Sequence, residues 1–326
     1  MEVVNFLKEK VLVTGSVGFI GMHVCKDLLD EGYEVIGLDN INDYYDQNLK
    51  KDRLKLLDAY DSFTFVKLDI YNFKKLLEIF DQFHPDKIIN LAGQAGVRYS
   101  IENPKEYVNS NIVGFFNLLE CAKIYNVKGL IYASSSSVYG GNEKIPFSVK
   151  DRIEKPLSVY AVSKITNELL AKTYFYIHGV RSTGLRFFTV YGPWGRPDMA
   201  MYIFAKNILE GGGIKLFNEG NMERDFTYIE DIVSGIKLAL EKNYQCEIFN
   251  LGNNKSENIM DIITILEKLL HRKANIILDK MQLGDVKSTH ADIDYSKEKL
   301  GYEPKTSIKQ GIPKFIDWFL KYHDNS

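Results

Sequence analysis

The chain has little of what marks disulfide-rich, membrane-spanning or strongly charged proteins. Three cysteines are scattered at Cys25, Cys121 and Cys246, and 41 Lys and Arg against 43 Asp and Glu leave a net charge of −2. So few cysteines argue against a disulfide framework or a thiolate metal site. No apolar run approaches the ~20 residues that cross a bilayer, and no signal-peptide pattern opens the chain. We therefore expect a cytoplasmic protein that binds no metal and does not insert into a membrane. Because the chain has no long basic block, we expect no nucleic-acid partner.

Length and patterning predict an α/β protein. At 326 residues with 45% hydrophobic residues, the chain has room for a sizeable core and about two domains. Apolar strands alternate with helix-compatible stretches as far as Val190, the rhythm of a doubly wound parallel Rossmann-type sheet. The expected strands are 11–14, 34–39, 63–69, 87–93, 129–133 and 183–190, and the expected helices are 49–60, a stretch ending near 83, a long stretch from 104 and 157–178. The turn-rich segment 191–198 then introduces a second, smaller α/β domain that binds the substrate. We place the cofactor domain at 1–188 plus about 223–252, and the substrate domain at about 189–222 and 253–326.

A loop with three glycines follows the first expected strand. Gly15, Gly18 and Gly21 separate the apolar run Val11–Thr14 from a helix-compatible stretch. Glycines there permit a tight turn and close approach of the backbone to a pyrophosphate, and the helix N-terminus attracts negative charge. The spacing departs from the commoner G-x-G-x-x-G, so the strand–loop–helix context carries the interpretation. The pattern predicts a dinucleotide site.

An acidic residue ends the second expected strand. Asp39 follows Gly15 by 24 positions, close to the spacing of a ribose-binding carboxylate. A carboxylate there accepts hydrogen bonds from ribose hydroxyls and repels a 2′-phosphate, which favours NAD over NADP. The alternative is that Asp39 is only a turn residue at the end of the strand.

Three side chains form a candidate proton-transfer group. Tyr160 and Lys164 lie four residues apart and so share a face of the expected helix. A protonated Lys164 is expected to lower the pKa of the Tyr160 phenol from ~10 toward the working pH. Ser135, after the expected strand 129–133, can share the substrate oxygen. Such a group removes a proton from an alcohol while a hydride leaves its carbon. A surface pair of Tyr160 with Lys164, and a merely polar serine loop, are the alternatives.

The candidate residues converge on one edge of the sheet. Asp39, Asp69, Gly93 and 134–137 all follow expected strands. Ligands of open parallel sheets bind beyond the carboxyl ends of the strands. The sequence therefore predicts a single site there.

Several segments resemble the extended short-chain dehydrogenase/reductases, and within that superfamily the UDP-glucuronate 4-epimerases. The resemblance runs nearly end to end, and the blocks 92–100 and 185–199 are its more specific parts. The matching segments are 13–21, 38–46, 92–100, 132–140, 160–164, 185–199, 224–229 and 284–286. One departure is Ser16-Val17, where small residues such as alanine are commoner.

The resemblance implies an epimerase with a resident NAD. Tyr160 would take the proton from the sugar 4-hydroxyl, Ser135 would hydrogen-bond the C4 oxygen, and Lys164 would also hold the nicotinamide ribose. Ser136 is the fourth residue of the implied catalytic set. The 4-keto sugar would turn over and regain hydride on its opposite face. The implied NAD-binding residues are Gly15, Gly18, Phe19, Ile20, Gly21, Asp39, Asn40, Asp69, Ile70, Leu91, Ala92, Gly93, Tyr160 and Lys164.

Substrate choice depends on the residues around the serines. Relatives that dehydrate hexoses carry an Asp-Glu pair after the active-site hydroxyl, and decarboxylases tend to carry a Glu two positions after it, where this chain has Ser136 and Ser137. We hypothesise that these hydroxyls, with Arg196, hold a uronate carboxylate near the carbonyl plane and oppose decarboxylation. Arg98 is a weaker candidate for that role. Arg196 could instead bridge the turn to a nearby acid.

The resemblance also assigns the UDP half and a dimer. Arg224 resembles a phosphate ligand, Asp285 a residue near the uridine ribose, and Thr189 stands where relatives bind diphosphate; Arg224 could instead pair with Asp225 or Glu223. The resemblance suggests a homodimer through helices 104–127 and 157–178, whose apolar faces could equally pack on the sheet. The expected activity serves surface polysaccharide. The alternatives are a 4-epimerase of UDP-glucose or of a UDP-N-acetylhexosamine or hexosaminuronate, and a non-catalytic nucleotide sensor.

Overall fold

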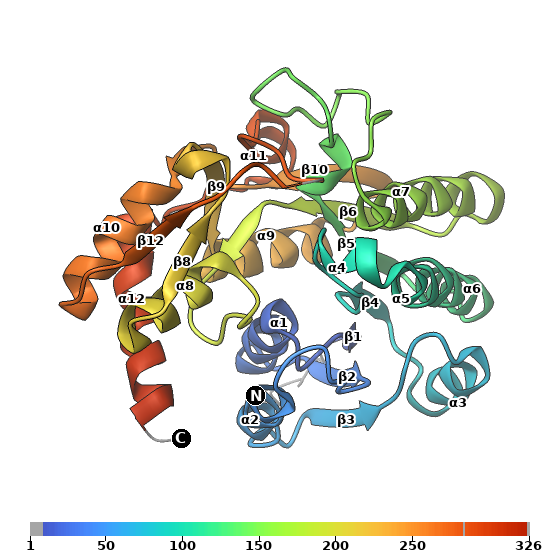
Figure 1. Ribbon diagram of the computed structural model, residues 1–326. Helices are drawn as coiled ribbons and strands as arrows, with labels where there is room; N and C mark the ends of the chain where they lie inside the picture. The colour runs from blue at the N-terminus through green and yellow to red at the C-terminus, as the bar shows by residue number, and fades with distance from the viewer. Residues whose placement is uncertain (1–8, 283, 325–326) are drawn as a thin grey trace.

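A seven-stranded parallel sheet forms the centre of the molecule. In the computed structural model, which describes residues 9–282 and 284–324, the strand order is β10-β6-β5-β4-β1-β2-β3 (Figure 1). The strands are β1 Lys10–Thr14, β2 Glu34–Asp39, β3 Phe63–Lys67, β4 Lys87–Asn90, β5 Gly129–Ser135, β6 Ser182–Phe187 and β10 Cys246–Leu251. Val11, Leu12 and Val13 are fully buried, as expected of a parallel strand covered on both faces. The order reverses between β1 and β4, the position at which such sheets bind ligands.

Helices cover both faces of this sheet. α3 (Phe73–Phe83), α6 (Gly114–Ile124) and α7 (Val159–His178) pack side by side on one face, where Phe80, Phe115 and Tyr132 share a core cluster. α1 (Phe19–Asp30) and α9 (Ile229–Lys242) pack together on the other face, with α2 (Gln47–Leu57) beside α1 (Figure 1). This confirms the predicted doubly wound α/β class.

Two predicted elements are interrupted in the structure. The long helix expected from Pro104 is divided into α5 (Pro104–Tyr107), the π-helical turn η1 (Val108–Val113) and α6. Within η1, the buried Asn111 side chain accepts from Gln94 N at 2.7 Å and donates to Gln94 O at 2.9 Å, so it holds the chain beyond β4. π-Helical turns of this kind are frequent at functional sites.

The strand expected over 183–190 is two strands. β6 ends at Phe187, and β7 (Thr189–Tyr191) joins a separate sheet of order β11-β9-β7 with β9 (Glu223–Tyr228) and β11 (Ser256–Asn258). A two-stranded sheet pairs β8 (Gly213–Leu216) with β12 (Asn275–Leu278). The chain thus leaves the main sheet at the point where the sequence pattern changes.

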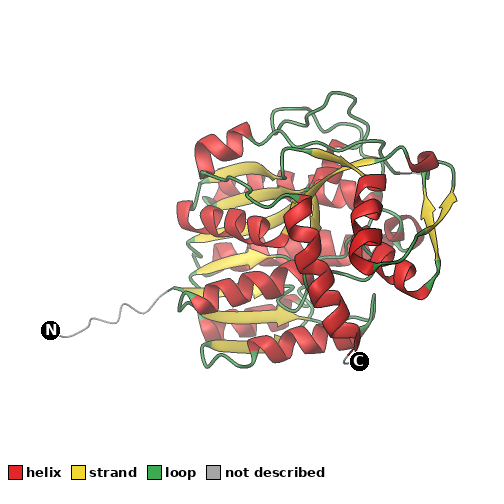
Figure 2. Cartoon of the chain, turned by 90° about the vertical axis from the view of Figure 1, so that its left-hand side faces the viewer, coloured by secondary structure: helices red, strands yellow, loops and turns green. Residues whose placement is uncertain are grey.

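The remaining helices accompany the small sheets. They are α4 (Tyr99–Glu102), α8 (Ala200–Glu210), α10 (Ile259–Leu270), α11 (Asp294–Leu300) and α12 (Ile308–Asp324). β8 and β12 stand apart from the main sheet in Figure 2. β10 returns to the main sheet beside β6. The domain boundaries, with about 223–252 assigned to the cofactor domain, stay a prediction. None of the described helices is long and apolar enough to cross a membrane.

Candidate active site

An open cleft lies beyond the carboxyl ends of β1, β2, β4, β5 and β6. Its volume is about 1680 Å³, including the solvent space at its mouth. It brings together nearly all of the predicted site residues. Those lining it are Gly15, Gly18, Phe19, Ile20, Gly21, Asp39, Asn40, Asp69, Ile70, Leu91, Ala92, Gly93, Ser135, Ser136, Ser137, Tyr160, Lys164, Thr189 and Arg196. Arg98, Arg224 and Asp285 gather in a separate cluster.

The glycine loop has the shape that a dinucleotide requires. Gly15 has a φ of +70°, and a Cβ there would lie 2.7 Å from Ala92 N; a Cβ at Gly21 would lie 1.9 Å from the Gly15 carbonyl oxygen. No side chain caps the start of α1 at Gly18, so its first amide groups are available to an anion. Val17, which stands where the resembled proteins more commonly have a small residue, is fully buried. The loop therefore fits the pyrophosphate of NAD.

Acidic side chains close the β2 end of the cleft. Asp39 is only 8% exposed, and its Oδ1 accepts from Ile41 N at 2.8 Å. Burial raises the pKa of Asp39, while hydrogen bonds from the Ile41 and Val17 amides and the charge of Lys50 act against that rise. Asn40 donates to Asp69 at 2.9 Å. A fixed carboxylate at this strand end fits the ribose hydroxyls of NAD.

Ser135, Tyr160 and Lys164 meet at the end of β5. α7 begins after Ser158, whose hydroxyl accepts from Ala161 N at 3.1 Å, so Tyr160 and Lys164 occupy its first turns. Lys164 Nζ donates to the Ala133 carbonyl at 2.8 Å and lies 5.9 Å from the centre of the Tyr160 ring. Ser135 Oγ lies 3.1 Å from Ser137 Oγ. The predicted group is thus assembled in the cleft.

The expected lowering of the Tyr160 pKa was wrong for the protein without ligands. Burial raises the pKa of Tyr160, against the opposing effects of a Ser135 hydrogen bond and the Arg196 charge. Burial also lowers the pKa of Lys164 to about 8. The physical reason is that the ammonium is itself desolvated and bonded to the Ala133 carbonyl, so loss of water dominates at the phenol.

A buried polar network behind the serines was not predicted from the sequence. Glu168, one helical turn after Lys164, binds Arg186 of β6 through two hydrogen bonds of 2.9 and 2.8 Å and accepts from Ser134 Oγ at 2.6 Å. Arg186 also donates to Tyr139 at 3.0 Å. Glu168 and Arg186 are 5% and 4% exposed, so this pair fixes α7 against β5 and β6. A charged residue inside each of two apolar elements was the available signal.

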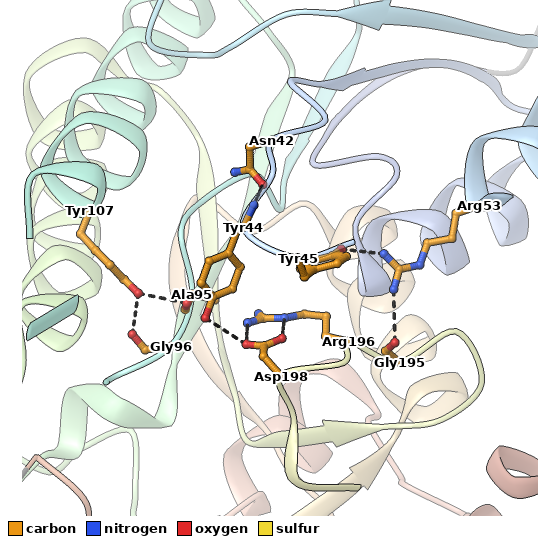
Figure 3. Close-up of polar contacts among 10 residues, drawn as sticks. All are labelled: Asn42, Tyr44, Tyr45, Arg53, Ala95, Gly96, Tyr107, Gly195, Arg196 and Asp198. Carbon is orange, nitrogen blue, oxygen red and sulfur yellow. Dashed lines mark hydrogen bonds and ion pairs between the residues drawn. The ribbon is translucent and has the colours of Figure 1, made fainter. Parts of the chain in front are cut away.

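Arg196 enters the cleft from the turn after β7. Its Nε and Nη2 both bond the carboxylate of Asp198, with Nε to Oδ1 at 3.0 Å (Figure 3). Tyr44, from the loop after β2, donates to the same carboxylate at 3.1 Å. The Asp198 charge raises the pKa of Arg196 although burial alone would lower it. The alternative pairing with a nearby acid is therefore present, and Arg196 lines the cleft as well.

Arg224 and Asp285 form an ion pair outside the cleft lining. Arg224 Nη2 lies 2.7 Å from Asp285 Oδ1, and Arg98 approaches the other oxygen at 3.7 Å. Arg98 also stacks over Phe217, 4.3 Å from the ring centre. Arg224 thus forms no ion pair with the carboxylate of Asp225 or Glu223. Its Nη1 donates instead to the Glu223 backbone carbonyl at 2.8 Å. No cluster of potential metal ligands occurs among residues 9–282 and 284–324.

A dinucleotide loop with a Ser–Tyr–Lys group on a doubly wound sheet defines a nicotinamide-dependent protein of the short-chain dehydrogenase/reductase type. The sequence model of the NAD dependent epimerase/dehydratase family matches residues 11–252, and the chain belongs to that family.

Three similar proteins extend over almost the whole chain. An uncharacterised protein of Methanocaldococcus jannaschii is 50% identical over 97% of this chain and 98% of its own. UDP-glucuronate 4-epimerase 4 of Arabidopsis thaliana is 48% identical over 96% of this chain and 76% of its own. The crystal structure of UDP-glucuronic acid 4-epimerase from Bacillus cereus, in complex with UDP-glucuronic acid and NAD, aligns with a TM-score of 0.90 at 36% identity, covering 96% and 99% of the two chains.

Proposed function

We propose that this protein is an NAD-dependent UDP-glucuronate 4-epimerase, an isomerase that forms UDP-galacturonate. One observation carries the proposal: Tyr160, which can take a proton from an alcohol, and Arg196, which can bind a carboxylate, line the same cleft. Relatives and solved structures named for this activity cover nearly all of the chain. Because both faces of C4 must be served in turn, the reaction needs a cleft in which the keto sugar can rotate.

The residues of the cleft divide the chemistry among them. NAD, held by the glycine loop and Asp39, supplies the acceptor and later the donor of hydride. Tyr160 takes the proton from the 4-hydroxyl and returns it, and Ser135 hydrogen-bonds the C4 oxygen. The Ser135 hydrogen bond and the Arg196 charge oppose the rise in the Tyr160 pKa and so favour the phenolate, and Lys164 would hold the nicotinamide ribose.

Carboxylate binding separates epimerisation from decarboxylation. Oxidation at C4 makes a β-keto acid, which loses carbon dioxide when the C5–carboxyl bond aligns with the carbonyl π system and electrons leave the carboxylate. Arg196, with the hydroxyls of Ser136 and Ser137, is proposed to hold the ionised carboxylate near the carbonyl plane and so oppose both. No carboxylate of this chain stands at 136 or 137 to act as acid or base for a dehydratase or decarboxylase.

The UDP half is proposed to bind at the Arg224 cluster and Thr189. Arg224 would contact the diphosphate, Asp285 the uridine ribose, and Thr189 the diphosphate from the start of β7. Arg98, with 57% of its side chain exposed, can reorient as the nucleotide enters. The Arg224–Asp285 ion pair gives each of these two charges a partner.

A homodimer is proposed to form through α6 and α7. These helices expose large apolar side chains: Phe116 41%, Val162 44%, Leu169 61%, Tyr176 72% and Ile177 68%. An exposed apolar patch of this kind is typical of a subunit interface. Replacing Leu169 by Glu should convert the dimer to monomer in light scattering; an unchanged mass would reject this interface.

The cytoplasm and the supply of surface polysaccharide are the proposed setting.

The deciding experiment is proton NMR of the purified protein with UDP-glucuronate and no added NAD. Conversion to UDP-galacturonate without UDP-xylose is expected. Turnover only of UDP-glucose or UDP-N-acetylglucosamine would keep the mechanism and reject the assignment of Arg196 and the serines. A nucleotide sensor would show neither turnover nor the 340 nm absorbance of reduced cofactor on adding substrate.

A further inference from the structure

Three consecutive backbone carbonyl groups just before Arg196 are hydrogen-bonded by side chains from the helices α1 and α2. His23 of α1 lies 2.9 Å from the Pro193 carbonyl through Nε2. Arg53 of α2 donates through Nη2 to the Trp194 carbonyl at 2.6 Å. The same Nη2 lies 3.4 Å from the Gly195 carbonyl (Figure 3). Trp194 has a φ of 62°, an uncommon conformation for a residue with a large side chain. The turn thus depends on these contacts for its shape.

Arg53 is an unusual residue to find in this position. Its side chain is fully buried, yet within residues 9–282 and 284–324 no carboxylate lies within ion-pair distance of it. Its other donors go to the Val17 carbonyl at 3.1 Å and the Tyr45 hydroxyl at 2.7 Å, and Nε has no partner. A buried charge without a counter-ion is costly unless its hydrogen bonds are specific. A role in stability alone would be better met by an apolar side chain.

The same contacts reach the cofactor loop. The Val17 peptide lies between Gly15 and Gly18; its carbonyl accepts from Arg53, and its amide acts to lower the pKa of the Asp39 carboxyl group. Hydrogen bonds of Arg53 therefore join the glycine loop to the turn that carries Arg196.

We propose that Arg53 is a positioning residue for uronate recognition, with His23 in support. It fixes the backbone of Trp194 and Gly195 to the cofactor loop, so that the Arg196 guanidinium faces the substrate carboxylate. This inference rests on the proposed function. Without Arg53 the Trp194 backbone can leave its left-handed conformation, and Arg196 loses its fixed direction while Ser135, Tyr160 and Lys164 keep theirs.

The expected consequence is a change in what the enzyme makes. In the 4-keto uronate the C5–carboxyl bond breaks, its electron pair forms the enolate of the 4-ketone, carbon dioxide leaves, and water supplies the proton to C5. A loosely held carboxylate permits this step. Arg53→Met should therefore raise KM for UDP-glucuronate about tenfold, leave kcat within about threefold, and release UDP-pentose, formed when the reduced cofactor returns its hydride to the decarboxylated 4-ketone. Arg53→Lys, which keeps the charge and part of the bonding, should lie between Arg53→Met and the wild type.

Arg181 provides a matched control. Its guanidinium also donates to the carbonyl of a left-handed residue, Asn243, and also has an unpartnered Nε, but it precedes β6 at the end of the sheet remote from the cleft. Arg181→Met should leave KM and the product ratio unchanged. If Arg53 acts through Arg196, Arg53→Met should add little to Arg196→Met; additive effects, or wild-type products from both Arg53 variants, would overturn the proposal.

A readout without turnover separates this inference from the proposed function. The only two tryptophans, Trp194 and Trp318, lie 5.4 Å apart between ring centres, so tryptophan fluorescence reports on the held turn. Acrylamide quenching should increase in Arg53→Met and not in Arg181→Met. If wild-type protein fails to convert UDP-glucuronate, the proposed function and the uronate part of this inference fall together, and increased quenching would still support the anchoring role. Unchanged quenching with intact wild-type turnover would reject Arg53 as the anchor.

Discussion

Arg196 and Asp198 form a two-point ion pair at the cleft, and Tyr44 from the cofactor side donates to the same carboxylate (Figure 3). The pair uses Nε and Nη2 of the guanidinium, which leaves Nη1 as the part of the fork available to a ligand. Asp198 therefore orients Arg196 without occupying all of it. A counter-ion in this place keeps the buried cation partnered between substrates.

The first prediction concerns the carboxylate. Arg196→Met should raise KM for UDP-glucuronate about 10- to 100-fold, because a charge-assisted hydrogen bond to the carboxylate is lost, and UDP-pentose should appear among the products. NMR product analysis and initial rates measure both. Arg152→Met is the control, since the Arg152 side chain is 86% exposed and its guanidinium lies 3.8 Å from Glu154. Normal epimerisation by the Arg196 variant would contradict the assigned role.

The second prediction concerns the base. Tyr160→Phe should lower kcat by about 10³-fold or more, since the phenyl ring can neither accept nor return the proton. Affinity for the UDP-sugar, measured by calorimetry, should change only a few-fold because UDP is held elsewhere. Tyr60→Phe, which removes an exposed hydroxyl bonded to Asp30, should behave as wild type. Substantial turnover by Tyr160→Phe would move the base to another residue.

Cofactor choice gives a third prediction. Asp39→Asn removes the charge that repels a 2′-phosphate, so the preference for NAD over NADP should fall by about tenfold or more. The cofactor retained through purification and the affinity of the apoprotein for each nucleotide measure the change. Asp30→Asn serves as control, because Asp30 pairs with Lys26 on the surface. An unchanged preference would mean that Asp39 serves only the loop, through the Ile41 and Val17 amides.

Local patterns were sufficient to predict six of the seven strands of the main sheet, all but β10, and most of the cleft. The strand ends at Asp39, Gly93 and Ser135 converge because parallel strands share one carboxyl edge, a consequence of topology that a sequence exposes. Resemblance supplied Arg196, which no spacing would have singled out.

The contacts of Arg53, Tyr44 and Asp198 were not predictable in the same way. Arg53 lies 141 residues from Trp194, and as part of Lys50–Arg53 it looks like a solvated helix face in the sequence. Its burial depends on how α2 meets the turn after β7, which no local pattern specifies. The raised pKa of Tyr160 was missed for a similar reason, because desolvation is set by the whole cleft.

The last prediction concerns stability below neutral pH. Burial lowers the pKa of His23 to about 4, and its Nε2 must carry the proton that it donates to the Pro193 carbonyl. The unfolded chain binds a proton at His23 near pH 6.5 and the folded chain does not, so this residue's contribution to the free energy of unfolding is complete above pH 6.5. That contribution falls as the pH decreases toward 4. Between pH 7.5 and pH 5 the wild type should lose about 2 kcal/mol from this residue.

His23→Gln keeps an N–H donor for Pro193 but does not titrate, so it should lack that loss. Urea unfolding of both proteins at the two pH values gives the double difference, in which groups common to both cancel. Equal losses would show that His23 is protonated in the folded protein, and that the anchor of the Arg196 turn stands in a wetter environment than its burial indicates.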